Sequence, residues 1–420
     1  MQQRGVELMT ANVATKTVQP SIEALSRAVD SLIPLVEQDA DEAERLYHLT
    51  DRVVAEFRRA GLYMLTVPKE IGGLELPWVE AMRLTERVSR VDGSTGWCMM
   101  VEGVVCAIMG AFLPDAGARI IYPNGADVAC AGNGVPRGFA RPVEGGYMVR
   151  GHWAYGSTIH HAEWIHSGCF VTDNDKPRMK PDGTPEIVQV HHPRSSIVLK
   201  GNWDSLGLRG SGSFDYTLTE PEMFVPQHMT FPLDGAKQWR GGIQYSAGLV
   251  TLTTWGHTSW ALGVGRRALD EIAAHARGRA DPFGKLHESP SFRLAFAQAE
   301  AKYRAARALV YEAWQSLDDS YARGEKANLE QLALIRLGMR HIHDVISEIS
   351  TFAHRTSRGV SLRPSALQRC YRDIHSGTQH ILLADEIAQE CGKVLLGTAG
   401  KDAQWTLFGV RAPGEQSKGH

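Results

Sequence analysis

The chain has 420 residues, of which 43% are hydrophobic and 22% are charged, and its formal net charge is -2. This is the profile of an ordinary soluble globular protein with room for two or three domains. The nearly balanced charge gives no electrostatic reason to expect nucleic acid or an anionic membrane as a partner.

Cysteine usage and the N-terminal segment favour a cytoplasmic protein. The six cysteines include no Cys-x-x-Cys pair, which indicates reduced, buried thiols rather than disulfides or a zinc framework. The N-terminal stretch "MQQRGVELMTANVATKTVQP" has no apolar core of signal-peptide length, and no window reaches transmembrane length. We therefore expect a cytoplasmic protein that does not partner with a membrane.

The first part of the chain predicts helices. Apolar residues recur at three- and four-residue spacing in "IEALSRAVDSLIPLVEQ" (22–38) and "YHLTDRVVAEFRRAGLYML" (47–65). The Pro/Gly-rich stretch "VPKEIGGLELPW" (67–78) then indicates a loop. The segment "DGSTGWCMMVEGVVCAIMGAFL" (92–113) is almost entirely apolar, which is typical of a helix buried on most sides. We assign residues 1–126 to an N-terminal helical domain.

The middle of the chain has a different pattern. Short β-rich runs such as "GGYMVRGHWAYGS" (145–157) and "AEWIHSGCFV" (162–171) are broken by Gly, Pro and Asn, which predicts an antiparallel β domain over 127–235. Long stretches of helical periodicity return afterwards and predict a bundle of antiparallel helices over 236–410. Residues 411–420 are typical of a disordered tail. The predicted fold class is α+β, mainly α.

No single motif names a function. "GVGRRA" (263–268) resembles a dinucleotide-binding fingerprint but lies inside a helical run, so it indicates close helix packing. "GLRGSGS" (207–213) suits either a phosphate cradle or a turn between strands. The histidine pairs at 160–161 and 191–192 lack Cys or carboxylate partners at ligand spacing, so we expect no metal site.

The order of the segments is more specific than any motif. From about residue 25 to 410 it resembles the acyl-CoA dehydrogenase superfamily: helical domain, β-barrel domain, four-helix bundle. "LTVPKEIGGLEL" and "DGSTGW" are similar to loops of that family, and "VEGGYMVRGHWAYGSTIHHAEW" is similar to the strand pair whose aromatic-x-Ser turn lies against the flavin ring. The resemblance therefore implies a flavin cofactor.

The same resemblance implies which residues hold the flavin. By their match to the turn, Tyr155 and Ser157 lie at the flavin ring, with Trp97 packed nearby. Ser211, in the second Gly-rich motif, is a further candidate cofactor contact. "HARGRADPFG" is like the helix end whose arginine, here Arg279, reaches the flavin phosphates of a neighbouring subunit of a homotetramer.

The stretch "RDIHSGTQHI" (372–381) holds two histidines that cannot share a helix face, because five residues turn the chain roughly 140° beyond one revolution. A metal site is therefore disfavoured. Acyl-CoA dehydrogenases commonly carry a glutamate before a Gly-Thr pair here as their base. This chain has Ser376, and a hydroxyl without an activating base is too weak for that task.

The stretch instead resembles the two-component flavin-dependent monooxygenases, a branch that includes the oxygenase component of p-hydroxyphenylacetate hydroxylase. "LQRCYRDIHSGTQHILLADEIAQECGKVLLG" (367–397) carries the match. It implies that reduced FMN or FAD reacts with O2 to a C4a-hydroperoxide, which hydroxylates an electron-rich ring. His380 would be the catalytic residue, an imidazole titrating near neutral pH that withdraws the substrate's proton. His375 is a candidate cofactor contact.

Two departures from this branch concern the substrate site. Several relatives carry a second active-site histidine on the buried helix, where this chain has Val-Val-Cys-Ala at 104–107. Several also carry a serine near flavin N5 on the first strand, where this chain has "CAGNGVP" (130–136). Asn133 could donate a hydrogen bond in its place as a second catalytic residue, or it could form a plain strand-end turn.

We expect the oxygenase component of a two-component monooxygenase, acting on a small aromatic or heteroaromatic substrate and supplied with reduced flavin by a separate reductase. The absence of a nicotinamide-site motif agrees with reduction taking place elsewhere. Two alternatives stay open. One is an acyl-CoA dehydrogenase or flavin oxidase with an unidentified base, and the other is a non-catalytic relative that binds no flavin.

Overall fold

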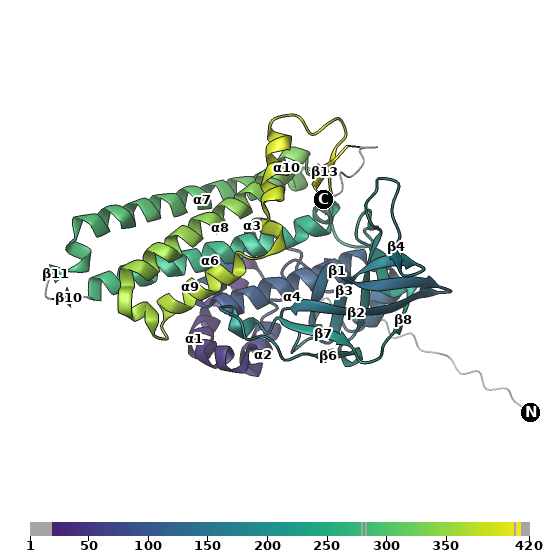
Figure 1. The fold of residues 1–420 in the computed structure, drawn as a ribbon, viewed down its shortest axis with the longest axis horizontal. Coiled ribbons are helices and arrows are strands. Elements are labelled where there is room, and N and C mark those ends of the chain that lie inside the picture. Colours follow the sequence, from purple (N-terminus) through teal and green to yellow (C-terminus); the bar gives the residue numbers. More distant parts are fainter. Residues whose placement is uncertain (1–18, 279, 282–283, 407–408, 413–420) are drawn as a thin grey trace, which may run out of the picture.

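The computed structural model describes residues 19–278, 280–281, 284–406 and 409–412. The chain opens with helices, as predicted, and Figure 1 shows them beside the long helices of the C-terminal part. Their bounds are α1 Ile22–Leu46, α2 Asp51–Arg59, α3 Trp78–Val91, α4 Gly93–Phe112 and α5 Asp115–Ile121. Side-chain oxygens of Ser21, Thr50 and Asp92 cap α1, α2 and α4 by accepting backbone N–H groups.

Helix α4 is buried on nearly every side. Only Val101 among its twenty residues is not fully buried, as its continuous apolar composition predicts. Contrary to the expectation that no window reaches transmembrane length, this helix is long and apolar enough to cross a membrane, but 94% of its most apolar window lies inside the fold. It is therefore a core helix, and it runs between the sheet and the C-terminal helices.

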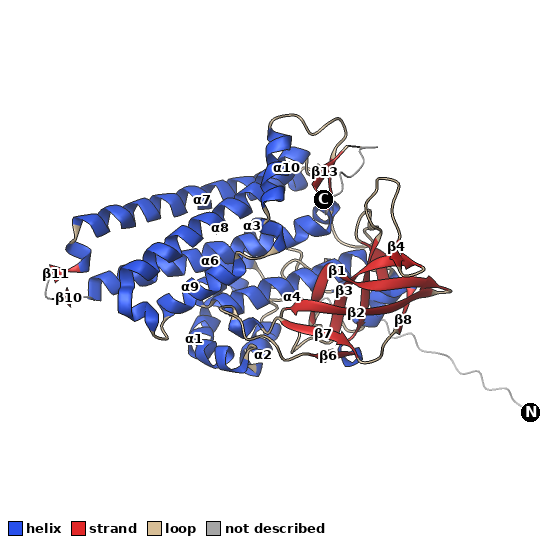
Figure 2. Cartoon of the chain, in the orientation of Figure 1, coloured by secondary structure: helices blue, strands red, loops and turns tan. Residues whose placement is uncertain are grey.

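The middle of the chain forms a nine-stranded sheet, and Figure 2 shows its strands gathered at one end of the molecule. The hydrogen-bonded path is β6-β7-β2-β1-β3-β5-β9, with β4 on β3 and β8 on β2. The strands are β1 Cys130–Val143, β2 Gly146–Gly156, β3 Trp164–Asp173, β4 Lys176–Pro177, β5 Ile187–Pro193, β6 Ile197–Leu199, β7 Phe214–Leu218, β8 Met223–Pro226 and β9 Thr230–Pro232.

The prediction of a purely antiparallel barrel is wrong in two respects. Strands β1 and β3 pair in parallel, from Cys130 opposite Trp164 to Ala140 opposite Val171. The turns after β2 return the chain to the end where β1 begins, because Glu163 and Trp164 donate their backbone N–H groups to Ala129. Strand β3 must then run in the direction of β1. Among the described strands, the path also ends at β6 and β9 instead of closing.

The predicted helical bundle is present. It consists of α6 Gly248–Gly278, α7 Pro290–Ala322, α8 Leu329–Ser357 and α9 Ala366–Gly377, and α10 Asp385–Leu395 packs on α8. "GVGRRA" lies within α6, where an added Cβ would lie 2.4 Å from the Glu86 carbonyl oxygen at Gly263 and 2.3 Å from Ile346 at Gly265. The glycines are therefore needed for close helix packing, as predicted.

The chain changes from helix to strand between Ile121 and Cys130, and back to helix between Pro232 and Gly248. One continuous hydrophobic core runs through all three parts, so the parts share their buried surface. Four further strands are short: β10 Ala280–Asp281 pairs with β11 Gly284–Lys285, and β12 Gln404–Thr406 pairs with β13 Gly409–Arg411. Of the predicted tail, Arg411 ends β13, and residues 413–420 lie outside the described residues.

Candidate active site

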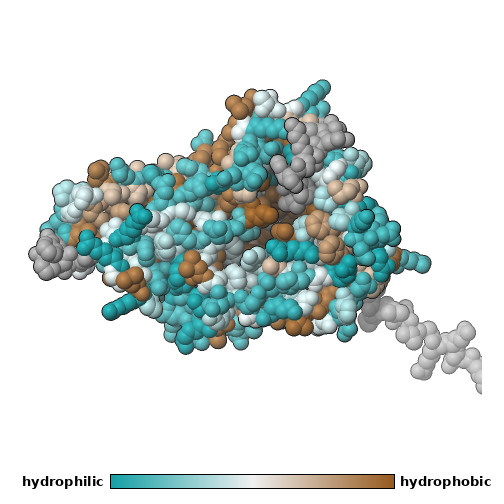
Figure 3. Space-filling view, in the orientation of Figure 1, coloured by the Kyte–Doolittle hydropathy of each residue, from teal (hydrophilic) through white to brown (hydrophobic). Residues whose placement is uncertain are grey.

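A cavity of about 620 Å³ lies where α4, the start of α6, strand β1 and the segment after α9 meet. Helix α4 supplies one wall, with Trp97 at one end and aliphatic side chains such as Val104 and Ile108 further along. Figure 3 shows an apolar hollow between the bundle and the sheet. The cavity is thus built from parts of the chain that lie far apart in sequence.

A chain of hydroxyl groups runs away from the cavity wall at the turn after β2. The Trp97 Nε1–H donates to Ser157 Oγ at 3.0 Å, Ser157 Oγ lies 2.6 Å from Ser213 Oγ, and Ser213 Oγ lies 2.8 Å from Ser211 Oγ. Tyr155 lines the cavity at the same turn with a φ of 63°, in the left-handed region. A non-glycine residue held in that region is typical of functional turns. Trp97, Tyr155 and Ser157 thus meet at the cavity, while Ser211 lies behind Ser213.

Two histidines face each other in the cavity. The ring centroids of His380 and His257 are 4.0 Å apart, and both rings lie against Trp97, at 6.1 Å and 4.9 Å respectively. Burial, followed by the charge of His343, lowers the pKa of His380 to about 4. Burial and then His380 hold the pKa of His257 well below its usual range. Both rings are therefore neutral at pH 7.

This geometry corrects the expectation of an imidazole that titrates near neutral pH. The backbone N–H of Leu382 donates to Nδ1 of His380 at 3.3 Å. A neutral imidazole carries one proton, so the Nδ1 that accepts this bond leaves the proton on Nε2. His380 is thus a hydrogen-bond donor through Nε2. His257 is buried, and its Nδ1 has no partner among the described residues.

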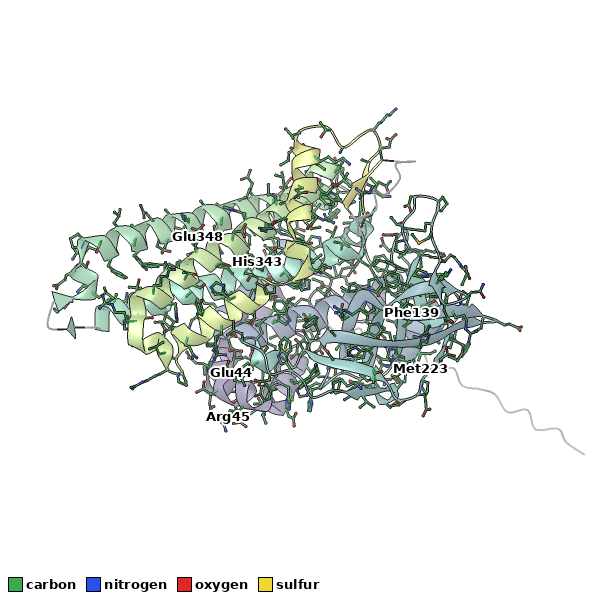
Figure 4. All side chains as sticks on the ribbon, viewed as in Figure 1. Glu44, Arg45, Phe139, Met223, His343 and Glu348 are labelled. Atoms are coloured by element: carbon green, nitrogen blue, oxygen red, sulfur yellow. The ribbon has the colours of Figure 1, made fainter. Side chains whose placement is uncertain are left out.

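The sequence reasoning missed His257, which lies in "TTWGHTSW" on helix α6. The expected place for a second histidine was residues 104–107 of α4, and here the second ring comes from the facing helix instead. A third histidine, His343, lies on α8 (Figure 4), and its ring stacks on that of Trp260 with centroids 5.9 Å apart. Its Nδ1 lies 2.8 Å from the Met339 carbonyl oxygen, one helical turn earlier in the chain.

A fourth histidine, His166, reaches the cavity from strand β3. Its neighbour His191 has Nδ1 2.9 Å from the Met229 carbonyl oxygen, so that nitrogen carries the proton of the neutral ring. His191 Nε2 then accepts from Nδ1–H of His166 at 2.9 Å. Burial lowers the pKa of both rings, so His166 is neutral and its Nε2 is left as an acceptor.

Contacts to α1 and to the β6–β7 loop hold the segment that carries His380. Arg372 of α9 forms a two-bond ion pair with Glu44 of α1, at 2.8 and 3.0 Å, and Figure 4 marks Glu44. Asp373 accepts the backbone N–H of Leu208 at 2.6 Å, and burial raises the pKa of its carboxyl to about 7. The Arg-Asp pair therefore fixes where α9 ends, and with it the position of His380. "GLRGSGS" is the turn that receives this contact.

His375 is not brought to this cavity. It lies within α9, where its Nε2 is 3.1 Å from Ser350 Oγ and its ring lies 4.4 Å from that of Tyr371. His380, by contrast, follows the end of the helix as the cap of a short 3₁₀ turn. Helix α9 runs through Ser376 and ends at Gly377, and this helix end separates the two rings.

Two predicted residues remain, Asn133 and Arg279. Asn133 lines the cavity, donates from Nδ2 to the Ala154 carbonyl oxygen at 2.8 Å and accepts the Val135 N–H at 2.9 Å. Its side chain thus shapes the backbone of β1. Arg279 lies outside the described residues.

The cavity suits a flavin ring. It offers an apolar wall from α4 and a strained aromatic-x-Ser turn with a hydroxyl at the wall. A flat tricyclic ring with one hydrophobic and one polar edge needs such a combination of surfaces. Fold and site together define a flavoenzyme.

Comparisons with known proteins agree with this class. Models of the acyl-CoA dehydrogenase N-terminal and C-terminal domains match residues 21–113 and 255–385. The chain is 30% identical to the indole-3-acetate monooxygenase of Pseudomonas putida over 90% of this chain and 94% of that one. It is 27% identical to the flavin-dependent monooxygenase oxygenase subunit HsaA of Rhodococcus jostii, over 84% and 92%. The structure of XiaF from Streptomyces with FADH2 and glycerol matches with a TM-score of 0.78 at 21% identity, covering 90% of this chain and 96% of that one.

The chain belongs to the acyl-CoA dehydrogenase superfamily, in its branch of two-component flavin-dependent monooxygenases. It is an oxygenase component that uses reduced flavin and O2 to hydroxylate an aromatic substrate, and a reductase supplies the reduced flavin. The fold-class prediction of a mainly helical protein with a middle sheet is confirmed.

Proposed function

We propose that the substrate ring is hydroxylated beside the His257–His380 pair, with His380 acting as a hydrogen-bond donor through Nε2. The observation that carries the proposal is the N–H of Leu382, which occupies Nδ1 of His380 and so places the only proton of the neutral ring on Nε2. A donor at this position would orient a substrate hydroxyl or ring nitrogen. It would also stabilise negative charge that develops on that atom.

His257 packs against this donor. Its Nδ1 is buried without a partner among the described residues, and its ring centroid lies 4.0 Å from that of His380. We infer that Nε2–H of His380 is the donor offered to the bound substrate and that the His257 ring supports it by packing, because Nδ1 of His257 is buried away from the open cavity.

The lining controls water. Bound reduced flavin would supply the activated oxygen, and Tyr155, Ser157 and Trp97 would hold its ring. The α4 wall and the apolar residues around it would keep bulk water from the reacting atoms, which such chemistry requires. The cavity lining also argues against an acyl-CoA dehydrogenase, whose base is commonly a glutamate, because no Asp or Glu is among the described residues that line the cavity.

The proposal also covers the location in the cell, the oligomeric state and the roles of Arg279 and Asn133. We infer a cytoplasmic homotetramer in which Arg279 reaches the flavin phosphates of a neighbouring subunit. Its support is the similarity of "HARGRADPFG" to the family's arginine-bearing helix end, and a guanidinium fork suits a phosphate. Asn133 is assigned to shaping the flavin-facing strand, since both of its described side-chain hydrogen bonds are to backbone groups.

Substitutions at His380 test the donor role. The amide nitrogen of glutamine can replace Nε2–H of histidine, so His380→Gln should hydroxylate within roughly tenfold of the parent, whereas His380→Ala should lose roughly 10²-fold or more. Indole-3-acetate, named for the Pseudomonas putida relative, is a suitable first substrate in a panel that also includes phenols. Product and hydrogen peroxide are measured together, because uncoupled turnover releases peroxide.

His375→Ala is the matched control, since the ring of His375 lies outside the cavity. It should retain parental coupling. If His380→Gln is as inactive as His380→Ala, a donor at Nε2 is not what the reaction uses. If no aromatic compound in the panel is hydroxylated in the presence of reduced flavin and O2, the substrate class is wrong.

A further inference from the structure

One charged side chain lines an otherwise uncharged cavity. Among the described residues that form the lining, Arg137 is the only arginine, and there is no lysine, aspartate or glutamate. The three histidines of the lining are neutral because burial lowers their pKa values. Arg137 itself is exposed, so its guanidinium lies on the solvent side of the cavity.

A bulge in strand β1 puts Arg137 there. The pairing of β1 with β3 places Asn133 opposite Ser167 and then Gly138 opposite Cys169. Residues 134–137 therefore stand against Gly168 alone and leave the ladder. Bulges of this kind redirect side chains and are common beside active sites. Val135 and Arg137 of the bulge both line the cavity.

Three contacts hold the bulge in place. The Asn133 side chain accepts the N–H of Val135 at 2.9 Å, and Gln189 Nε2 donates to the Gly134 carbonyl oxygen at 3.0 Å. A Cβ on Gly168 would lie 2.2 Å from that same oxygen, so only glycine lets the bulge pack across β3. The bulge is therefore a specified feature of the fold.

The Arg137 guanidinium has no hydrogen-bond, ion-pair or aromatic partner in the described part of the chain. Other arginines in or next to the strands are paired: Arg141 with Glu222, Arg150 with Asp175 and Arg178 with Asp173. An unpaired guanidinium presents a planar fork of donors that matches a carboxylate in two bonds. Its place at the cavity indicates a ligand with an anionic group.

We propose that Arg137 binds the carboxylate of the substrate, so that the enzyme selects aromatic acids over uncharged rings. This inference rests on the proposed function. An aromatic acid would bury its ring against the α4 wall and the histidine pair and keep its charge at Arg137. No charge would then be buried without a partner, which is the condition for binding an anion at an apolar cavity.

Paired ligands test the selection. Indole-3-acetate and indole-3-acetamide share a ring and differ in charge, and their binding to the protein with reduced flavin is measured by calorimetry under anaerobic conditions. The acid should bind about tenfold more tightly than the amide, the effect of one charge-assisted contact at a partly solvated site. The preference should shrink as salt is raised, because exposed charges are screened.

Arg137→Gln should abolish the preference by weakening the acid and leaving the amide unchanged, and Arg137→Lys should retain part of it. Arg141→Gln is the matched control, from the same strand but outside the cavity, and should behave as the parent. Equal binding of acid and amide by the parent overturns the proposal. So does an Arg137→Gln variant that keeps the preference but binds reduced flavin more weakly, since Arg137 would then serve the flavin phosphate. Binding is measured without turnover. The difference in affinity between acid and amide can therefore be interpreted even if the hydroxylation assay fails.

Discussion

Glu102 is a buried carboxyl group on α4, and replacing it with glutamine should change how stability depends on pH. Its side chain is 2% exposed, and it accepts the Thr158 hydroxyl at 3.2 Å, just beyond the turn that carries Ser157. Burial raises its pKa from 4.5 to about 8. Between these two values the folded protein therefore holds a proton that the unfolded chain has already released.

The sign and size follow from proton linkage. The protonated carboxyl of Glu102 adds to the free energy of unfolding. This stabilisation is fully present below pH 4.5 and is lost as the pH rises through about 8, because the folded state binds the extra proton. One proton corresponds to about 1.4 kcal/mol per pH unit, so the whole interval is worth at most about 5 kcal/mol. Glu102→Gln keeps an acceptor for Thr158 and cannot ionise. Its free energy of unfolding should therefore rise relative to the parent by about 1.4 kcal/mol per pH unit between pH 5 and 8.

Urea unfolding followed by tryptophan fluorescence at pH 5, 6, 7 and 8 measures this difference. Glu312→Gln, an exposed position on α7, provides the comparison for a solvated glutamate. A difference between Glu102→Gln and the parent that stays constant from pH 5 to 8 would refute the reasoning. It would mean that Glu102 is ionised in the folded protein or reaches water.

Two further substitutions probe the cavity walls. Trp97→Phe removes the donor to Ser157 and should lower the free energy of unfolding by roughly 1 kcal/mol, and a double-mutant cycle with Ser157→Ala should show that the two losses are not additive. Gly377→Ala would place a Cβ 2.2 Å from the Trp260 ring, so it should cost roughly 1–3 kcal/mol of stability and raise the peroxide released per product by displacing the segment after α9. Gly392→Ala, with open space around its Cβ, is the control for Gly377→Ala, and equal coupling in the two variants would contradict the account.

Local patterns in the chain were enough for the order of helices and strands. The three-part order of helices, strands and helices and the buried helix α4 follow from short-range periodicity and turn residues. His380 was found through a family resemblance in its own segment. Trp97, Tyr155 and Ser157 were found in the same way, and the structure brings all four to one cavity.

Other features depend on contacts that no local pattern encodes. Nothing in "TTWGHTSW" distinguishes His257 from an ordinary core histidine. Only the ring of His380, packed against it in the fold, marks His257 as a candidate site residue. The protonation of His380 could not be read from its type, since the Leu382 N–H and burial decide which nitrogen carries the proton.

The same holds for the sheet. Alternation predicts that strands exist, but pairing direction depends on where the chain returns after each turn, and here β3 returns beside β1 in parallel. The bulge that directs Arg137 to the cavity needs Gly168 and Gln189 from neighbouring strands. Short-range periodicity therefore suffices for which segments are helix or strand, whereas the electrostatics and shape of the site arise only when distant segments pack together and exclude water.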